Sequence, residues 1–294
     1  MTTTTNPLRG ILLFVASLAL FACMDTTTKY LAARHDVPLI VAARYIGNLL
    51  LMLVLLTPRH GEKLLRTERT GMAVVRALCL AASSVLVGFA LQRMPVAETT
   101  AINFLAPMLV VVAAGPLLGE KIGWVGWAAA LFGFTGVLLI VRPGSGLEPI
   151  GVICALAGVA AAMGYQMLSR VLAASESTIA LLFYTALAGS IIFGLALPWY
   201  WTGETPPPFE MLLFASLGVY GGLGHFLLTA AYRHAPASLL APTNYLQLLW
   251  AGLLGWMVFG HLPDRITALG MAIVALSGVA VALHARRPPV KRDL

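Results

Sequence analysis

Charged and amide side chains lie deep inside apolar stretches of this sequence. At 1.5 Å per helical residue, Asp25, Arg44 and Asn103 each lie about 9 to 10 Å from the outer end of their stretch, so the three share one depth. A charged group in hydrocarbon costs at least about 2.5 kcal/mol, so these side chains must face protein or a water-filled cavity. A carboxylate and a guanidinium at one level can bind the two charges of a zwitterion. The alternative is a salt bridge between Asp25 and Arg44 that only braces the helices.

A second polar group lies near the opposite ends of later stretches, and it is hydrogen-bonding and aromatic rather than ionic. Gln166, His225 and Asn244 lie roughly 5 to 12 Å from those ends. Simple packing is the alternative for the aromatic residues of this group, and His225 is either a satisfied buried histidine or a proton-sensitive one. The predicted substrate-binding residues here are Tyr165, Gln166, Tyr184, His225, Asn244, Tyr245 and Trp250.

Prolines and the remaining charges have less specific interpretations. Pro107 and Pro242 each remove a helical hydrogen bond and permit a bend, so we predict that they mark gating elements. Lys29 is expected to pair with Asp25 one turn away or to reach the interface, and Arg76 to reach the interface with its long side chain. Glu98 lies at a helix end, where a charge needs no special role.

Ten apolar runs must position these residues. The 294 residues are 59% hydrophobic and only 11% charged, against about 25% charged in soluble domains. Each run is close to the roughly 20 residues that cross a hydrocarbon core of about 30 Å. The sequence therefore predicts an all-α membrane protein with ten transmembrane helices. The runs are 10–31, 37–57, 71–91, 96–118, 122–141, 150–169, 177–198, 209–231, 237–259 and 266–284.

The sequence repeats itself at an offset of 141 residues. Setting Pro95 on Pro236 also sets Gly10 on Gly151 and Asn103 on Asn244. The two predicted domains are therefore five-helix repeats, 1–145 and 146–294. Five is odd, so the second repeat enters the membrane from the other side, and the repeats are inverted. Inverted repeats favour transport by alternating access around a site near the midplane.

The distribution of positive charge predicts the membrane topology. With the amino terminus inside, 12 Lys and Arg residues fall on the cytoplasmic side and 4 on the other. We therefore expect an inner-membrane, multi-pass protein with both termini cytoplasmic, and we do not read the net charge of +7 as a nucleic-acid site. Cys23, Cys79 and Cys154 lie inside apolar runs without CxxC spacing, so no metal site, no cofactor and no catalytic residues are predicted.

The sequence resembles the drug/metabolite transporter superfamily, in its ten-helix EamA-type branch. The resemblance covers nearly the whole chain and is most specific at residues 95–107, 117–120 and 136–143, with a second copy at 235–242. His261 departs from the pattern, because the first repeat carries Glu120 there. The resemblance implies a central cavity that the other eight helices line and that the helices at 122–141 and 266–284 do not. Those two helices carry almost no ionisable residues and are expected to be scaffold or a homodimer face.

Together these features predict a secondary transporter that exports small amino-acid-like or zwitterionic metabolites, metallophores included, by alternating access. Its expected partners are a small-molecule substrate and membrane lipid. An alternative is uptake of an adenosylmethionine-like or flavin-like compound. A remote alternative is an intramembrane enzyme or an assembly subunit, which lacks support because the sequence has no GxSxG, HExxH, CxxC or Walker motif.

The charge distribution leads to a test of topology. A reporter fused after Leu294 should be active only in the cytoplasm, and one inserted in the loop at 199–208, which lacks Lys and Arg, should report the outside. The measurement is paired alkaline phosphatase and fluorescent-protein activity in whole cells. The opposite pattern would reverse the assignment of every depth.

Overall fold

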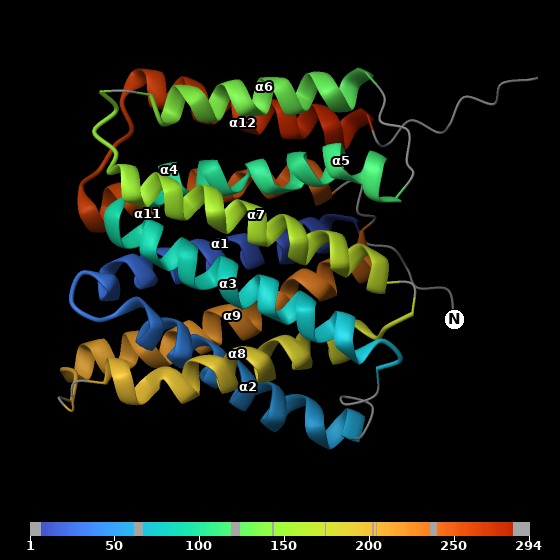
Figure 1. Ribbon diagram of the computed structural model, residues 1–294, viewed down its shortest axis with the longest axis vertical. Coiled ribbons are helices and arrows are strands. Elements are labelled where there is room, and N and C mark those ends of the chain that lie inside the picture. Colours follow the sequence, from blue (N-terminus) through green and yellow to red (C-terminus); the bar gives the residue numbers. More distant parts are fainter. Residues whose placement is uncertain are drawn as a thin grey trace, which may run out of the picture.

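The chain is a bundle of helices that run side by side along one direction (Figure 1). The computed structural model describes residues 7–61, 67–118, 124–142, 144–173, 175–201, 203, 205–235 and 240–284. Their helices are α1 (Pro7–Ala32), α2 (Val37–His60), α3 (Thr70–Arg93), α4 (Val96–Asn103), α5 (Leu105–Leu118), α6 (Trp124–Ile140), α7 (Pro149–Leu172), α8 (Thr178–Tyr200), α9 (Pro208–His234), η2 (Ala241–Tyr245), α11 (Leu246–Phe259) and α12 (Arg265–His284).

These helices confirm the predicted fold class. Counting α4 with α5 and η2 with α11, the described residues form ten spans, and each overlaps one predicted apolar run. Six of them, α1, α2, α3, α7, α8 and α9, contain a continuous segment long and apolar enough to cross a membrane. The chain is a multi-pass membrane protein.

Two spans are broken, at equivalent places in the two repeats. Pro107 has no N–H for the carbonyl of Asn103 four residues earlier, and α4 ends at Asn103. In the second repeat Pro242 lies in the short 3₁₀ segment η2, which contains Asn244, and the α-helix starts only at Leu246. Both breaks put an asparagine at an interrupted part of the backbone.

The helix contacts have the two-fold pattern expected of inverted repeats. α1 packs on α9 and α3 packs on α7, and each of these pairs is the counterpart of the other at an offset of 141 residues. The same relation holds for single residues. A Cβ on Gly10 would meet the Cβ of Ala235 at 2.5 Å, and a Cβ on its counterpart Gly151 would meet the Cγ of Met94, the counterpart of Ala235, at 2.7 Å. The symmetry therefore extends to side-chain packing.

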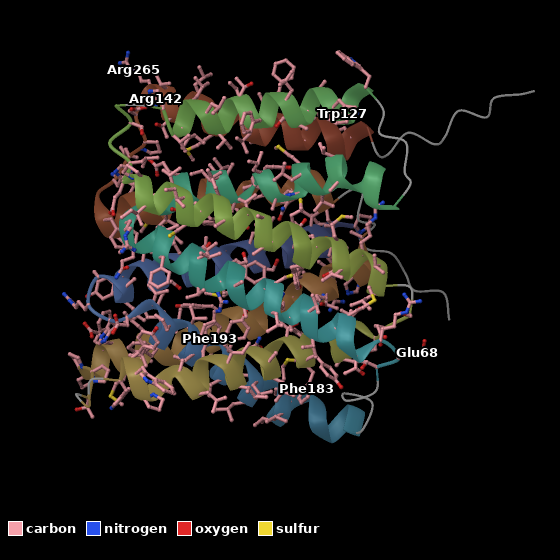
Figure 2. All side chains as sticks on the ribbon, in the orientation of Figure 1. Glu68, Trp127, Arg142, Phe183, Phe193 and Arg265 are labelled. Atoms are coloured by element: carbon pink, nitrogen blue, oxygen red, sulfur yellow. The ribbon has the colours of Figure 1, made fainter. Side chains whose placement is uncertain are left out.

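α6 and α12 pack on each other at one edge of the bundle (Figure 1). Their backbones approach closely, because a Cβ on Gly136 would lie 2.7 Å from the carbonyl oxygen of Gly270. At one end of this pair Arg142 donates to Asp264 at 2.6 Å, and Figure 2 places Arg142 at the end of the bundle opposite to Glu68. The backbone N–H of Thr267 and the Arg142 guanidinium lower the pKa of Asp264 to about 2.

Close backbone contact between α2 and α9 leads to a test of packing. A Cβ on Gly218 would lie 2.7 Å from the backbone of Gly47, whereas nothing lies within 4 Å of one on Gly252. Gly218→Ala should therefore lower the free energy of unfolding by roughly 1 to 3 kcal/mol through overpacking. Gly252→Ala should leave it unchanged or raise it, because alanine favours a helix interior. The measurement is thermal unfolding in detergent, and equal midpoints for the two variants would contradict the assigned contact.

Candidate functional site

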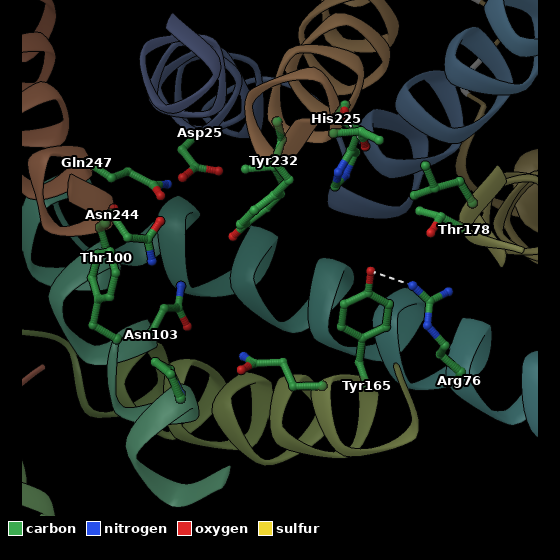
Figure 3. A pocket seen from close by; sticks show the side chains of 16 residues that line it. Asp25, Arg76, Thr100, Asn103, Tyr165, Thr178, His225, Tyr232, Asn244 and Gln247 are labelled. Atoms are coloured by element: carbon green, nitrogen blue, oxygen red, sulfur yellow. Dashed lines mark hydrogen bonds between the residues drawn. The ribbon is translucent and has the colours of Figure 1, made fainter. Parts of the chain in front are cut away.

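A polar cavity of about 670 Å³ lies between the two repeats (Figure 3). Residues from both repeats line it, on α1, α3, α4, α5, α7, α8, α9, η2 and α11. Six of the predicted substrate-binding residues and one of the two predicted gating prolines are among them. The polar or proline lining residues are Asp25, Arg76, Thr100, Asn103, Pro107, Tyr165, Gln166, Thr178, His225, Thr229, Tyr232, Asn244 and Gln247.

The cavity has chemically different ends. Figure 3 shows Asp25, Asn103, Asn244 and Gln247 gathered at one end, and Arg76 at the other. The asparagines come from the two broken spans, so the helix breaks bring equivalent amides to one place. A carboxylate with several amides at one end can hold a cationic group and satisfy its hydrogen bonds.

A second cavity of about 270 Å³ adjoins the first and shares Asp25, His225 and Gln247 with it. Arg44 lines this second cavity. Its guanidinium donates a hydrogen bond to Ser84 Oγ and lies 4.9 Å from the centre of the Tyr45 ring. Arg44 and Asp25 therefore face one common space, as their equal depth predicts.

Asp25 and Arg44 do not brace the helices as a salt bridge. Among the described residues no ion pair or hydrogen bond joins their side chains, and the Asp25 carboxylate has no hydrogen-bond partner. It faces both cavities instead. The Asp25 carboxylate is therefore available to a ligand, while Arg44 acts on it electrostatically across the shared space.

Arg76 lies near the amino-terminal end of α3, and its side chain was expected to extend to the membrane interface. It does not do so. It is 5% exposed. Its guanidinium donates to Ser169 Oγ at 2.6 Å and to the Tyr165 hydroxyl at 2.8 Å. The sequence could show its depth but not which neighbours surround it.

Lys29 differs from its predicted pairing, because no ion pair or hydrogen bond joins it to Asp25 in the described structure. Its ammonium donates to the carbonyl oxygens of Leu91 at 2.9 Å and Met94 at 2.7 Å, at the end of α3. Carbonyls at a helix end lack helical partners, and a cation there is favourable. Lys29 thus fastens α1 to the end of α3.

Three predicted aromatic residues line neither cavity. The Tyr245 ring packs on Phe104 with centroids 4.8 Å apart and its hydroxyl lies against Gly278 of α12. Trp250 packs against a buried apolar cluster that includes Phe14 and Leu18. Tyr184 is half-buried on α8. The packing alternative fits the surroundings of Tyr245 and Trp250.

Several lining residues were missed from the sequence, above all Thr100, Tyr232 and Gln247. All three carry a signal that could have found them. Thr100 lies three residues before Asn103 and Gln247 three residues after Asn244, so each shares a helix face with a predicted residue. Tyr232 lies seven residues after His225 on α9, so it also shares a helix face with a predicted residue.

The cavity reaches the side of the bundle on which α1 begins, since Thr178, the first residue of α8, lines it. The opposite side is closed by contacts between the repeats. Glu98 of α4 is buried, and one of its carboxylate oxygens lies 2.8 Å from Nε2 of His261, between α11 and α12. Glu98 therefore has a specific partner, contrary to the expectation of an ordinary charge at a helix end. Leu91 of α3, Val96 of α4 and Ala251 of α11 form a buried apolar cluster that joins the two repeats.

Two inverted five-helix repeats around a polar cavity that reaches one side of the membrane define a membrane transporter. The family comparison gives the same class. The chain belongs to the EamA-like transporter family, whose profile matches residues 8–142 and 149–283. The predicted family is confirmed, and the chain is a secondary transporter of metabolites and not an enzyme.

Curated relatives resemble the chain over almost its full length. An S-adenosylmethionine uptake transporter of Rickettsia bellii is 29% identical over 90% of each chain. A pseudopaline exporter of Pseudomonas aeruginosa is 27% identical over 93% of this chain and 95% of the relative. A riboflavin transporter of Brucella anthropi is 27% identical over 88% of this chain and 93% of the relative. These relatives include both an uptake transporter and an exporter.

A solved structure supports the fold. A crystal structure of a protein 22% identical to this chain superimposes with a TM-score of 0.67, covering 96% of this chain and 98% of the other. At this identity the likeness concerns the fold alone.

The contact between Glu98 and His261 leads to a test of closure. His261→Ala should remove a bond that holds the two repeats together and so increase access to buried residues from that side. A cysteine at Thr28, which is 7% exposed, should then react several-fold faster with a membrane-impermeant maleimide, in a background where Cys23, Cys79 and Cys154 are alanine.

The matched control for this test is His234→Ala, at the carboxyl end of α9, which should leave the labelling rate of the Thr28 cysteine unchanged. Equal rates in the parent protein and His261→Ala would show that the contact does not hold this side closed.

Proposed function

We propose that this transporter exports small amino-acid-like zwitterions by alternating access through the cavity between its repeats. The observation that carries the proposal is the Asp25 carboxylate, which faces the cavity without a hydrogen-bond partner in the described structure and has Arg44 across the adjoining space. An ammonium or sulfonium group of a substrate supplies the partner that Asp25 lacks. Buried charges are paired in proteins, and here the second member of the pair is the substrate.

The remaining lining residues have roles that follow from their chemistry. Asn103, Asn244 and Gln166 offer donors and acceptors to a polar or heterocyclic part of the substrate. Tyr165 and His225 add rings that can lie against it. A volume of about 670 Å³ lies within the range of roughly 300 to 1,000 Å³ common for small-molecule sites, which supports a single metabolite as the cargo.

Uptake of an adenosylmethionine-like compound is the second candidate. It is favoured by relatives named as S-adenosylmethionine uptake transporters, which match over 90% of this chain. Such a compound also carries a sulfonium or ammonium cation for Asp25 and a heterocycle for the amides. The two candidates share the binding chemistry and differ in substrate size and in direction.

Gating, topology and assembly extend the proposal. The breaks before Pro107 and around Pro242 are the places where we expect the fourth and ninth spans to bend as one side closes and the other opens. The protein is expected in the inner membrane, with both termini in the cytoplasm. A homodimer through α6 and α12 remains a prediction, to be checked by mass photometry in nanodiscs.

Transport in proteoliposomes tests this proposal. The parent protein should exchange labelled L-histidine or S-adenosylmethionine, and Asp25→Asn should lower that exchange at least tenfold because the charged hydrogen bond to the cation is lost. Arg44→Ala should also lower it. Imposing the substrate gradient in each direction on oriented vesicles distinguishes export from uptake.

The control for this experiment is Asp264→Asn, which removes a carboxylate outside the cavity and should leave exchange unchanged. All variants must remain monodisperse in detergent. Rescue of exchange when Asp25 and Arg44 are swapped would show a structural pair and contradict the proposed binding roles.

A further inference from the structure

Arg76 is a buried cation that no residue of the described chain neutralises. It lines the main cavity at the end away from Asp25 (Figure 3). Its four hydrogen bonds go to neutral oxygens, and among the described residues no carboxylate lies within ion-pair distance. Neutral acceptors orient a guanidinium but do not neutralise its positive charge. A buried positive charge is unfavourable in a membrane protein unless an anion compensates it.

The hydrogen bonds fix the Arg76 guanidinium and leave one donor. A guanidinium has five N–H groups. Nε donates to Ser169 Oγ at 2.6 Å, Nη1 to Leu181 O at 3.1 Å and Thr185 Oγ1 at 2.9 Å, and Nη2 to the Tyr165 hydroxyl at 2.8 Å. The second N–H of Nη2 has no acceptor among the described residues.

The acceptors around Arg76 are themselves arranged for a cation. Ser169 Oγ donates its own hydrogen to the Tyr165 carbonyl at 2.6 Å, and Thr185 Oγ1 donates to the Leu181 carbonyl at 2.8 Å. Both hydroxyls therefore present only lone pairs to Arg76. The Tyr165 hydroxyl accepts from Arg76, and its own O–H has no acceptor among the described residues.

The two cavities also have an excess of positive charge. The Asp, Glu, Lys and Arg residues that line them in the described structure are Asp25, Arg44 and Arg76. One negative and two positive groups leave a net charge of +1. A substrate with a cationic group at Asp25 therefore still meets an unneutralised guanidinium at the other end.

We propose that Arg76, with Tyr165, is the site that binds a carboxylate of the substrate and so determines specificity for carboxylated over decarboxylated compounds. The carboxylate accepts the free Nη2–H of Arg76 and the free O–H of Tyr165. This inference rests on the proposed function, because it needs a substrate whose cation binds at Asp25. It adds a second anchor at the far end of the cavity, so the cargo is an elongated zwitterion.

Paired ligands test the role of the carboxylate. Binding of S-adenosylmethionine and its decarboxylated form, and of L-arginine and its decarboxylated form agmatine, is measured by scintillation proximity on purified protein. The parent protein should prefer the carboxylated member of a bound pair about tenfold or more, as expected for a charged hydrogen bond. Arg76→Gln should bind both members with similar affinity, because the substitution weakens binding of the carboxylated member only. Arg76→Lys should keep part of the preference, and Tyr165→Phe should lower it several-fold.

The controls separate a binding role from a structural one. Arg142→Gln removes a guanidinium that lies outside both cavities, and it should keep the preference for the carboxylated ligand. If Arg76→Gln weakens both members of a pair equally, Arg76 only supports the helices and the proposal is wrong. Arg76→Lys and Tyr165→Phe decide the same question if Arg76→Gln does not fold.

The result in the parent protein separates this inference from the proposed function. A parent protein that transports both members of a pair equally well keeps its function but overturns the role of Arg76. A parent protein that neither binds nor transports any of the four compounds contradicts the proposed substrate class, and the Arg76 inference with it.

Discussion

Hydrocarbon cannot solvate a charge, and this constraint determines where every chemically active residue of the protein lies. Asp25, Arg44 and Arg76 belong to α1, α2 and α3, and all three face cavities between the repeats rather than lipid. α6 and α12 lie at the edge of the bundle and expose apolar side chains such as Leu131 and Leu276. The division into cavity helices and an outer pair thus follows from the cost of burying charge.

The inverted symmetry provides the cavity, and departures from the symmetry provide its chemistry. Gly10 and Gly151 make equivalent close contacts, and Asn103 and Asn244 lie at equivalent breaks. Asp25, however, has Gln166 as its counterpart at the 141-residue offset, so a carboxylate faces an amide across the pseudo-symmetry. Similar backbones with different side chains let one cavity hold a ligand whose two ends differ.

The sequence was sufficient for the fold and for one end of the site, because both depend on position along the helix. Apolar run length predicted the ten spans, and depth alone placed Asp25 and Asn103 at one level. Arg76 and Lys29 were misplaced because depth does not determine which neighbour a side chain meets. Tyr245 and Trp250 were assigned to the cavity for the same reason. Helices that are apolar on every side carry no periodic pattern, so the sequence does not indicate which face is turned inward.

The contacts that close one side of the protein have no chemically equivalent counterpart at the symmetry-related positions that would close the other side. Glu98, which meets His261 on the closed side, has Leu239 as its counterpart at the 141-residue offset, and His261 has Glu120. The first pair joins a carboxylate to an imidazole, whereas the two equivalent positions, one in each repeat, hold a leucine and a carboxylate. The two closed states therefore need not have the same free energy. A ligand shifts a two-state equilibrium only by its differential affinity for the states. Binding at Asp25 must accordingly offset whatever difference the unlike contacts create before the transporter can turn over.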